Sequence, residues 1–292
     1  MDDLTYTLLN LCHRNRDGSH TTQADRRRTL TLISRQLKDA GFRRMTACSL
    51  KSKHVDALLK RWQTEELSVG TIKNRMAVLR WWAEKIGRAG IIPANNDHLA
   101  IPRRELVTNE NKARHLGDNL EHVTDPHVRV SLELQQQFGL RREECIKFQP
   151  RYADRGDHIE LKGSWTKGGR TRGVPITTAE QRAVLDAAHQ LVGAGSLIPA
   201  HKTYIQQRNI YDGECKSAGL SNMHGLRHLY AQTRYEALTG WKAPTAGGPF
   251  AAVLTTAQRT LDANARQNIS RELGHVPKLP QSIWDGKQAR RA

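Results

Sequence analysis

The segment His224-Gly-Leu-Arg227-His228 places an imidazole and a guanidinium three residues apart. On a helix this spacing puts both groups on one face, where they can bind the same small anion. Taken alone, the pattern is more typical of a solvated helix face. A zinc site is disfavoured, because Gly225 stands where a zinc protease motif carries its glutamate between two histidines. The rest of the chain must decide what this segment binds.

A second cationic group follows an expected helix over 126–138. Gly139 breaks that helix, and in Gly139-Leu-Arg141 the arginine stands near the start of a new one, with Glu144 three residues on. An anion at this point would also be favoured by the helix dipole. Further along the chain, Leu-Gly-His275 adds another imidazole after an expected helix over 261–273. These residue types indicate a site for a phosphate-like anion.

Lys167 stands just before Gly168-Gly169, between two β-like segments at 158–165 and 172–176. Tight hairpin turns need positive φ, so the glycine pair predicts a β-hairpin with Lys167 beside its tip. A lysine at such a tip often serves only solubility. The hairpin is the one β signal in a chain whose other patterns are helical, so the expected fold is mainly α with a small β-hairpin (α+β).

Composition points to a nucleic-acid partner. The 292 residues include 46 lysines and arginines against 29 aspartates and glutamates, for a formal charge of +17. Such a balance attracts a phosphate backbone by releasing its counterions. The four cysteines are scattered without metal-ligand spacing, so neither a zinc ribbon nor a disulfide framework is indicated. No signal peptide and no run of 18 apolar residues is present, so we expect an intracellular protein without a membrane partner.

The first 100 residues predict a small helical domain. Apolar residues recur at helical spacing over 22–40, 51–62 and from Ile72 to Ile86, whereas residues 1 to about 20 have little pattern and are expected to form a loop or arm. All three helices are basic, and the third carries the candidate DNA-binding residues Lys73, Arg75 and Arg80 opposite its apolar face. A basic linker with Arg103 and Arg104 is expected over 101–118.

The second domain is expected over 119–292. Besides the elements already named, helical patterns cover 178–192, 204–218 and the segment from His224, and the Gly/Pro-rich stretch 239–250 predicts an exposed loop. In order along this domain stand Arg141, Lys167, His224-x-x-Arg227 and Leu-Gly-His275. This order resembles the tyrosine recombinases, the integrases of phages and integrative elements. The resemblance extends to the first domain, where Leu67-Ser-Val-Gly-Thr-Ile-Lys-Asn-Arg75 is similar to that family's helical core-binding domain.

The resemblance implies a two-domain clamp on double-stranded DNA, acting as a tetramer or hetero-oligomer in a prokaryotic cytoplasm, at the nucleoid. Arg141 and Arg227 would hold the non-bridging oxygens of a phosphate during strand cleavage, without metal or cofactor. His224 and His275 would donate hydrogen bonds or move a proton, and Lys167 would protonate the departing 5′-oxygen. In supporting roles, the resemblance implies Glu144 bracing Arg141 and His228 packing nearby. Arg170, beside the hairpin turn, is a further candidate DNA-binding residue.

One element of the family pattern is absent. The nucleophilic tyrosine is expected nine residues after His275, where this chain has Trp284. An indole nitrogen only donates hydrogen bonds and cannot attack phosphorus. Two hypotheses follow: a recombinase that uses another nucleophile or one from a partner subunit, and a recombinase-like DNA-binding protein that does not cleave. A type IB topoisomerase would also need the tyrosine, and an RNA-binding protein without a phosphate pocket is a further alternative.

Overall fold

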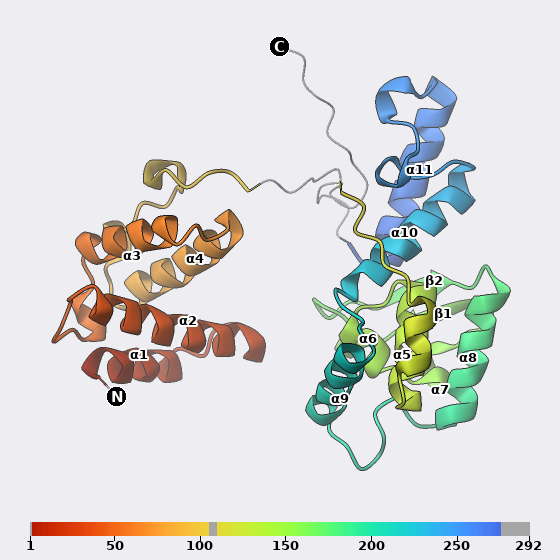
Figure 1. Ribbon diagram of the computed structural model, residues 1–292, viewed down its shortest axis with the longest axis horizontal. Helices are drawn as coiled ribbons and strands as arrows, with labels where there is room; N and C mark the ends of the chain where they lie inside the picture. The colour runs from red at the N-terminus through yellow and green to blue at the C-terminus, as the bar shows by residue number, and fades with distance from the viewer. Residues whose placement is uncertain (1, 105–109, 276–292) are drawn as a thin grey trace. The chain divides into compact units, whose positions relative to one another are not determined.

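The computed structural model describes residues 2–104 and 110–275, and the chain divides into two compact units, Met1–Glu105 and Leu106–Ala292 (Figure 1). Each unit has its own apolar core. The division falls inside the stretch that was expected to be a linker over 101–118. The segment that joins the two cores is shorter than 101–118, because Ile101 is buried in the first core and Leu116 in the second.

The first unit is helical. Its α-helices are α1 (Asp3–Arg14), α2 (His20–Asp39), α3 (Ser52–Thr64) and α4 (Val69–Lys85), and short 3-10 helices span Ala47–Ser49, Ala89–Ile91 and Asp97–Leu99. The core contains Trp62 and Trp82, whose indole N–H groups donate to Gln36 Oε1 and to the Ala47 carbonyl. These bonds satisfy the polar edge of each buried ring.

The expectation of a loop or arm over residues 1–20 is wrong. Helix α1 covers Asp3–Arg14, and Asp2 caps it by accepting a 2.8 Å hydrogen bond from the Thr5 amide. Leu4, Leu8 and Cys12 are buried at a spacing of four residues, which places them on one helix face. This short apolar stripe is the sequence feature that predicts the helix.

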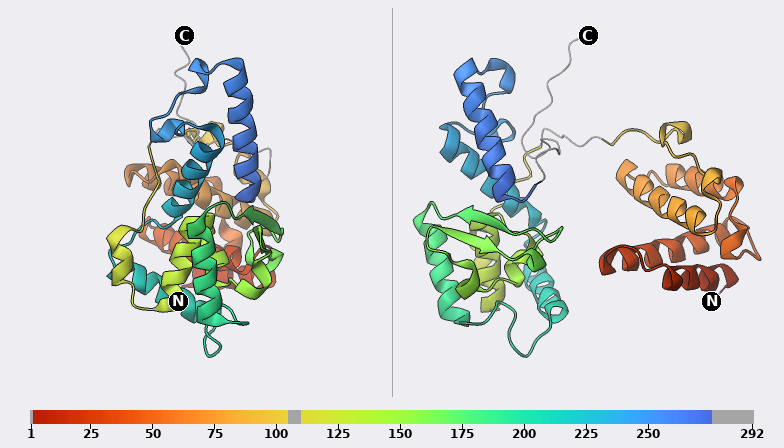
Figure 2. Two further views of the ribbon diagram at one scale, coloured as in Figure 1. Left: turned by 90° about the vertical axis from the view of Figure 1, so that its right-hand side faces the viewer. Right: turned by 180° about the vertical axis from the view of Figure 1, so that it is seen from behind.

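The second unit surrounds helix α5 (Pro126–Phe138), which packs against α8, α9 and α10. The remaining elements are α6 (Arg142–Ile146), α7 (Pro150–Ala153), β1 (His158–Leu161), β2 (Arg172–Pro175), α8 (Ala179–Val192), α9 (Tyr204–Ser217), α10 (His224–Thr239) and α11 (Thr256–Glu272). Short 3-10 helices span Gly117–His122, Gly163–Trp165, Pro244–Ala246 and Ala251–Val253. In the views of Figures 1 and 2, α10 and α11 form a pair at one end of the unit.

Strands β1 and β2 form the predicted antiparallel hairpin, with His158 opposite Pro175 and Leu161 opposite Arg172. Gly168 and Gly169 have φ values of +91° and +71°, as the turn prediction requires. The first strand ends at Leu161 rather than near 165, since the 3-10 helix Gly163–Trp165 follows it. The fold is therefore mainly helical with one small β-hairpin, as predicted.

Two other boundaries differ from the expectation in this unit. Helix α11 begins at Thr256 rather than near 261, because Thr255 caps it by accepting from the Gln258 amide while the Gln258 side chain accepts from Thr255. The stretch 239–250 is not an exposed loop throughout, since Ala243 and Pro244 are buried. No helix in the described part of the chain is long and apolar enough to cross a membrane.

Candidate active site

Arg227 lies in the first turns of α10 and is 2% exposed. Its guanidinium donates to the Gly139 carbonyl at 2.5 Å and to the Leu273 carbonyl. The first acceptor follows the end of α5 and the second follows the end of α11, so one side chain joins three helices. Burial, together with the nearby Arg141 and Arg172, lowers the pKa of Arg227. The two carbonyls compensate part of the cost of burying this cation.

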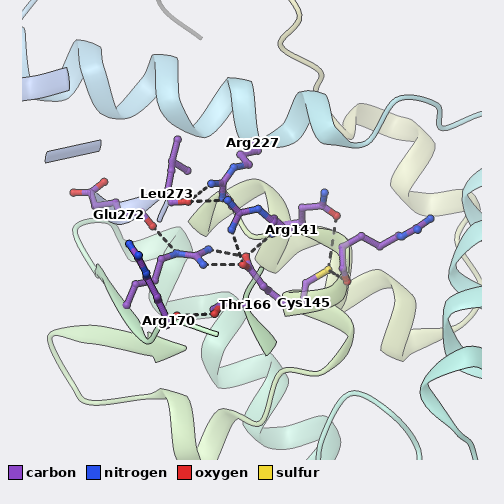
Figure 3. Close-up of polar contacts among 12 residues, drawn as sticks. Arg141, Cys145, Thr166, Arg170, Arg227, Glu272 and Leu273 are labelled. Atoms are coloured by element: carbon purple, nitrogen blue, oxygen red, sulfur yellow. Dashed lines mark hydrogen bonds and ion pairs between the residues drawn. The ribbon is translucent and has the colours of Figure 1, made fainter. Parts of the chain in front are cut away.

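Arg141 approaches the same point from the start of α6. Its Nη2 donates to the Leu273 carbonyl at 3.3 Å, and its Nη1 donates to Glu144 Oε1 at 2.9 Å. In Figure 3 the Arg141 and Arg227 side chains lie next to each other beside Leu273. The backbone amide of Arg141 donates to Glu144 Oε2 at 2.7 Å. Glu144 therefore caps the start of α6. An anion bound at that helix end, as the dipole favours, would face this carboxylate.

Glu144 is fully buried, and it accepts from two arginines. Arg172 at the start of β2 donates to both carboxylate oxygens, at 2.7 and 2.6 Å, while Arg141 donates to one of them. Burial alone would raise the pKa of Glu144, but the hydrogen bonds from Arg172 and Arg141 outweigh it and lower that pKa. Glu144 thus lies against Arg141.

Arg172 was not predicted as a site residue. Its signal in the sequence is strand alternation, because position 172 lies on the same face of β2 as the buried Val174. A charged residue at an inward strand position indicates a buried partner, which the structure identifies as Glu144. Arg271, exposed near the end of α11, is a second cation of this region that sequence reasoning missed.

His275 directly follows the Leu273-Gly274 turn, and its Nε2 lies 3.5 Å from Arg227 Nη2. Its backbone amide donates to the Ser270 carbonyl, which holds the residue at the end of α11. Burial, then the charges of Arg227, Arg141 and Arg172, lower the pKa of His275 to about 4. The imidazole is therefore neutral at pH 7 and offers one donor and one acceptor.

A groove of about 510 Å³ opens beside these residues, and it is lined mostly by cations and glycines. Its lining includes Arg141, Lys167, Gly168, Arg170, Arg172, Arg271, Gly274 and His275. Lys167 and Arg170 are exposed on the hairpin connection, where the Arg170 carbonyl accepts from the Thr166 hydroxyl at 2.6 Å (Figure 3). The groove is a cationic site whose charge suits a phosphate.

His224 is the first residue of α10 and is exposed. Its pKa is lowered by partial burial and by the charges of Arg227 and Arg141. It lines a neighbouring cavity with Arg142, Tyr211 and Cys215 and does not line the 510 Å³ groove. The structure thus brings Arg141, Lys167 and His275 to one groove. Arg227 is buried behind them, with its Nη2 near His275, and His224 lines the neighbouring cavity instead.

His228 supports His224 from the next turn of α10. The two rings meet edge to face at 5.4 Å between centroids, and burial with the charges of His224 and Lys112 lowers the pKa of His228 to about 4. Gly225 between them lies against the 112–114 segment, and a Cβ there would stand 2.3 Å from Arg114 Cγ. A glutamate cannot fit at this position. Within residues 2–104 and 110–275, no cluster of three or more His, Cys, Asp or Glu could hold a metal ion.

The cations predicted to bind DNA from the first unit differ in their surroundings. Arg80 donates to the Pro93 carbonyl at 3.0 and 2.9 Å and to Asn96 at 2.7 Å, so its guanidinium holds the segment after α4. Arg75 lies over the Trp62 ring at 5.3 Å. Lys73 is half-buried and Arg103 and Arg104 are exposed. Trp284, at the expected nucleophile position, lies outside the described residues.

Comparison with known proteins places the chain in a family. Residues 1–92 match the family model described as phage integrase, N-terminal, and residues 104–233 match the model described as integrase. The first match lies within the first unit, and the second covers the second unit as far as residue 233. Together with the structural likenesses below, they show that the chain belongs to the tyrosine recombinase (integrase) family. The resemblance inferred from the site residues is confirmed. Among curated proteins, none matches the chain.

Solved structures with a similar fold are recombinases. The XerH site-specific recombinase in a post-cleavage complex with palindromic difH substrate has a TM-score of 0.57 at 16% identity, over 93% of this chain and 78% of that one. A lambda integrase dimer bound to a COC′ core site has a TM-score of 0.55 at 15% identity, over 94% and 80%. The Tn1549 transposon integrase with circular intermediate DNA has a TM-score of 0.51 at 13% identity, over 97% and 98%.

Proposed function

We propose that the chain binds double-stranded DNA and holds one backbone phosphate in the groove of the second unit, for integration or recombination by phosphoryl transfer through a covalent 3′-phosphoprotein intermediate. The observation that carries this proposal is the convergence of Arg141 and Arg227 on the Leu273 carbonyl beside His275. Guanidinium groups that are fixed before the reaction can stabilise transition-state charge without reorganising. Lys167 and Arg170, exposed beside the groove, supply further positive charge for the DNA backbone.

The residues divide the chemistry between them. Arg141 lines the groove and would donate to the non-bridging oxygens of the phosphate, in the planar geometry that guanidinium offers. Arg227 is buried behind the groove and would add its positive charge from there. His275 is neutral at pH 7, so its ring can accept the nucleophile's proton or donate to a phosphate oxygen. Lys167 stands at the hairpin tip, where an ammonium group can give its proton to the departing 5′-oxygen.

The described tyrosines do not supply a nucleophile to this groove. None lines it, and the hydroxyl groups of Tyr152, Tyr211, Tyr230 and Tyr235 donate to Glu160, Gln135, Glu272 and Asp262 respectively. For Tyr230, burial and the adjacent Glu272 carboxylate raise the pKa far above its ordinary value. A phenol in that state is a poor nucleophile at neutral pH.

The alternative is a recombinase-like DNA-binding protein that holds the phosphate without cutting the strand, and Trp284 favours it. Such a chain would act as a regulator or as one subunit of a mixed assembly. Either form would act on DNA, as a tetramer or hetero-oligomer, and would work in the cytoplasm at the nucleoid. The solved relatives with DNA bound, one of them as a dimer, support this choice of partner.

A covalent-adduct experiment separates the two forms. The chain first selects its own binding sequence from a random duplex library, and the selected duplex is then made as a nicked suicide substrate. Strand transfer predicts a protein–DNA adduct that resists denaturation with the unmodified chain. The non-cleaving form predicts binding without adduct, and an adduct with Trp284→Tyr. The control is Trp284→Tyr combined with Arg141→Gln, which should form none. If neither the chain nor Trp284→Tyr forms adduct, the phosphoryl-transfer proposal is wrong.

A further inference from the structure

The Arg172 side chain is 7% exposed and its guanidinium contacts two other elements of the second unit. Two of its nitrogens donate to the Glu144 carboxylate of α6, and its Nε donates to the Glu272 carbonyl at 2.8 Å, at the end of α11. Arg172 itself begins strand β2. One residue thus ties the hairpin that carries Lys167 to the two segments that hold Arg141 and His275.

The contacts of Glu144 define what this tie positions. Oε1 accepts from both Arg172 and Arg141, and Oε2 accepts from Arg172 and from the Arg141 backbone amide. The carboxylate therefore lies between the two arginines, and its orientation is set from one side by Arg172. A fully buried carboxylate with one partner removed must turn toward the partner that remains.

Gly274 gives an independent sign that Arg172 determines the local geometry. Its φ is +63°, and a Cβ at this position would stand 2.9 Å from Arg172 Cδ. The Arg172 stem therefore lies directly against the turn that leads into His275. A larger residue in the Leu-Gly-His segment would displace either the turn or the arginine.

We infer that Arg172 is a positioning residue for phosphate binding, which sets the orientation of Arg141 through Glu144 and the place of His275 through the end of α11. This inference rests on the proposed function. Lysine cannot replace arginine in this role, because a single ammonium group cannot donate in parallel to both carboxylate oxygens and also to the Glu272 carbonyl. Arg172 acts through its neighbours, and its exposure is too low for extensive contact with DNA.

The test uses the full chain with inorganic phosphate as the probe, at constant ionic strength, and follows the His275 ring signals by NMR. Arg172→Lys keeps the buried positive charge and should keep the fold, as checked by circular dichroism and thermal melting. We expect its phosphate affinity to fall about tenfold, the effect of a weakened charge-assisted hydrogen bond. Arg172→Gln should bind at least as weakly, and without phosphate its His275 should titrate at a higher pH, because one repelling cation is gone.

The matched control is Arg142→Lys. Arg142 is the neighbour of Arg141 in sequence but is exposed and pairs with Asp212 at 2.6 Å, away from the groove. Its replacement should leave phosphate affinity unchanged. If folded Arg172→Lys binds phosphate as tightly as the unmodified chain, with the same change at His275, Arg172 has a structural role only and the inference is overturned.

Arg141→Gln separates this outcome from failure of the proposed function. Should Arg141→Gln also bind phosphate as tightly as the unmodified chain, the groove is not a phosphate site and the proposed function fails first. A loss with Arg141→Gln, together with none for Arg172→Lys, overturns only the inference about Arg172. A lower melting temperature with unchanged phosphate affinity in Arg172→Lys would likewise overturn only the inference about Arg172.

Discussion

Arg227 donates a hydrogen bond to the backbone carbonyl of Leu273, 46 residues further along the chain. Leu273 follows the last turn of α11, and carbonyls at the end of a helix lack partners within the helix and attract cations. Arg141 donates to the same carbonyl, and Arg172 to that of Glu272. The end of α11 therefore gathers three arginines immediately before His275.

Arg227→Lys should destabilise the second unit and weaken DNA binding. A lysine has no planar fork and cannot bond both carbonyls as Arg227 does. The Leu273 carbonyl keeps the donor from Arg141, but loss of the bond to the buried Gly139 carbonyl should cost about 1–3 kcal/mol. Urea unfolding measures this change. Arg142→Lys is the control, because its exposed pair with Asp212 should contribute less than about 1 kcal/mol. Equal stabilities for the two variants would contradict the role assigned to the buried guanidinium.

Gly139→Ala and Gly213→Ala should change stability in opposite directions. Gly139 has a φ of +60°, and a Cβ there would stand 2.6 Å from the Tyr230 ring, so alanine should cost about 2 kcal/mol or more. Gly213 lies within α9 with open space around it, so alanine should stabilise the protein by about 0.5–1 kcal/mol. Thermal melting of both variants checks the pair, and a stable Gly139→Ala would refute the close packing at this turn.

The salt dependence of DNA affinity should distinguish Arg170 from Arg80. Arg170 is exposed beside the groove, so Arg170→Gln should reduce the slope of log affinity against log salt by about 1. Arg80 is bound to Pro93 and Asn96, so Arg80→Gln should lower stability and leave the slope nearly unchanged. Fluorescence anisotropy with one duplex at several salt concentrations gives both slopes. A reduced slope for Arg80→Gln alone would reverse these assignments.

Stability should fall on acidification through the site histidines. The pKa of His275 in the folded chain is about 4, below its ordinary value of 6.5, so the folded state binds fewer protons than the unfolded one. Its contribution is fully present above pH 6.5 and is lost as the pH falls toward 4. Urea unfolding at pH 7.5 and 5.0 measures the loss, and His275→Gln should show a smaller one. An unchanged difference in that variant would show that His275 does not titrate in this way.

Much of the fold follows from local patterns. The spacing of apolar residues predicts α2, α3 and α4, and Gly168-Gly169 predicts the hairpin, because both patterns depend on neighbours within a few residues. The missed helix α1 was also local, but its apolar stripe is short. The order of Arg141, Lys167, Arg227 and His275 was enough to infer the family, since each stands in a recognisable local context.

The connections within the site could not be predicted in the same way. The Gly139 and Leu273 carbonyls that hold Arg227 belong to residues whose types say nothing about hydrogen bonding. The Arg172–Glu144 pair joins residues 28 positions apart, so it needs the tertiary fold to become visible. The predicted DNA contact of Arg80 stays a prediction, although the structure engages its guanidinium internally.

The use of main-chain acceptors at the end of α11 also bears on how this site can change over generations. A side-chain acceptor disappears with one codon change, whereas the Glu272 and Leu273 carbonyls survive almost any substitution at those positions. Substitutions at positions 272 and 273 should therefore leave the acceptors of the three arginines in place. The positions where a substitution should matter are those that shape the backbone, such as Gly139 and Gly274. A chain could therefore lose a residue elsewhere in the site and still keep these three arginines in place.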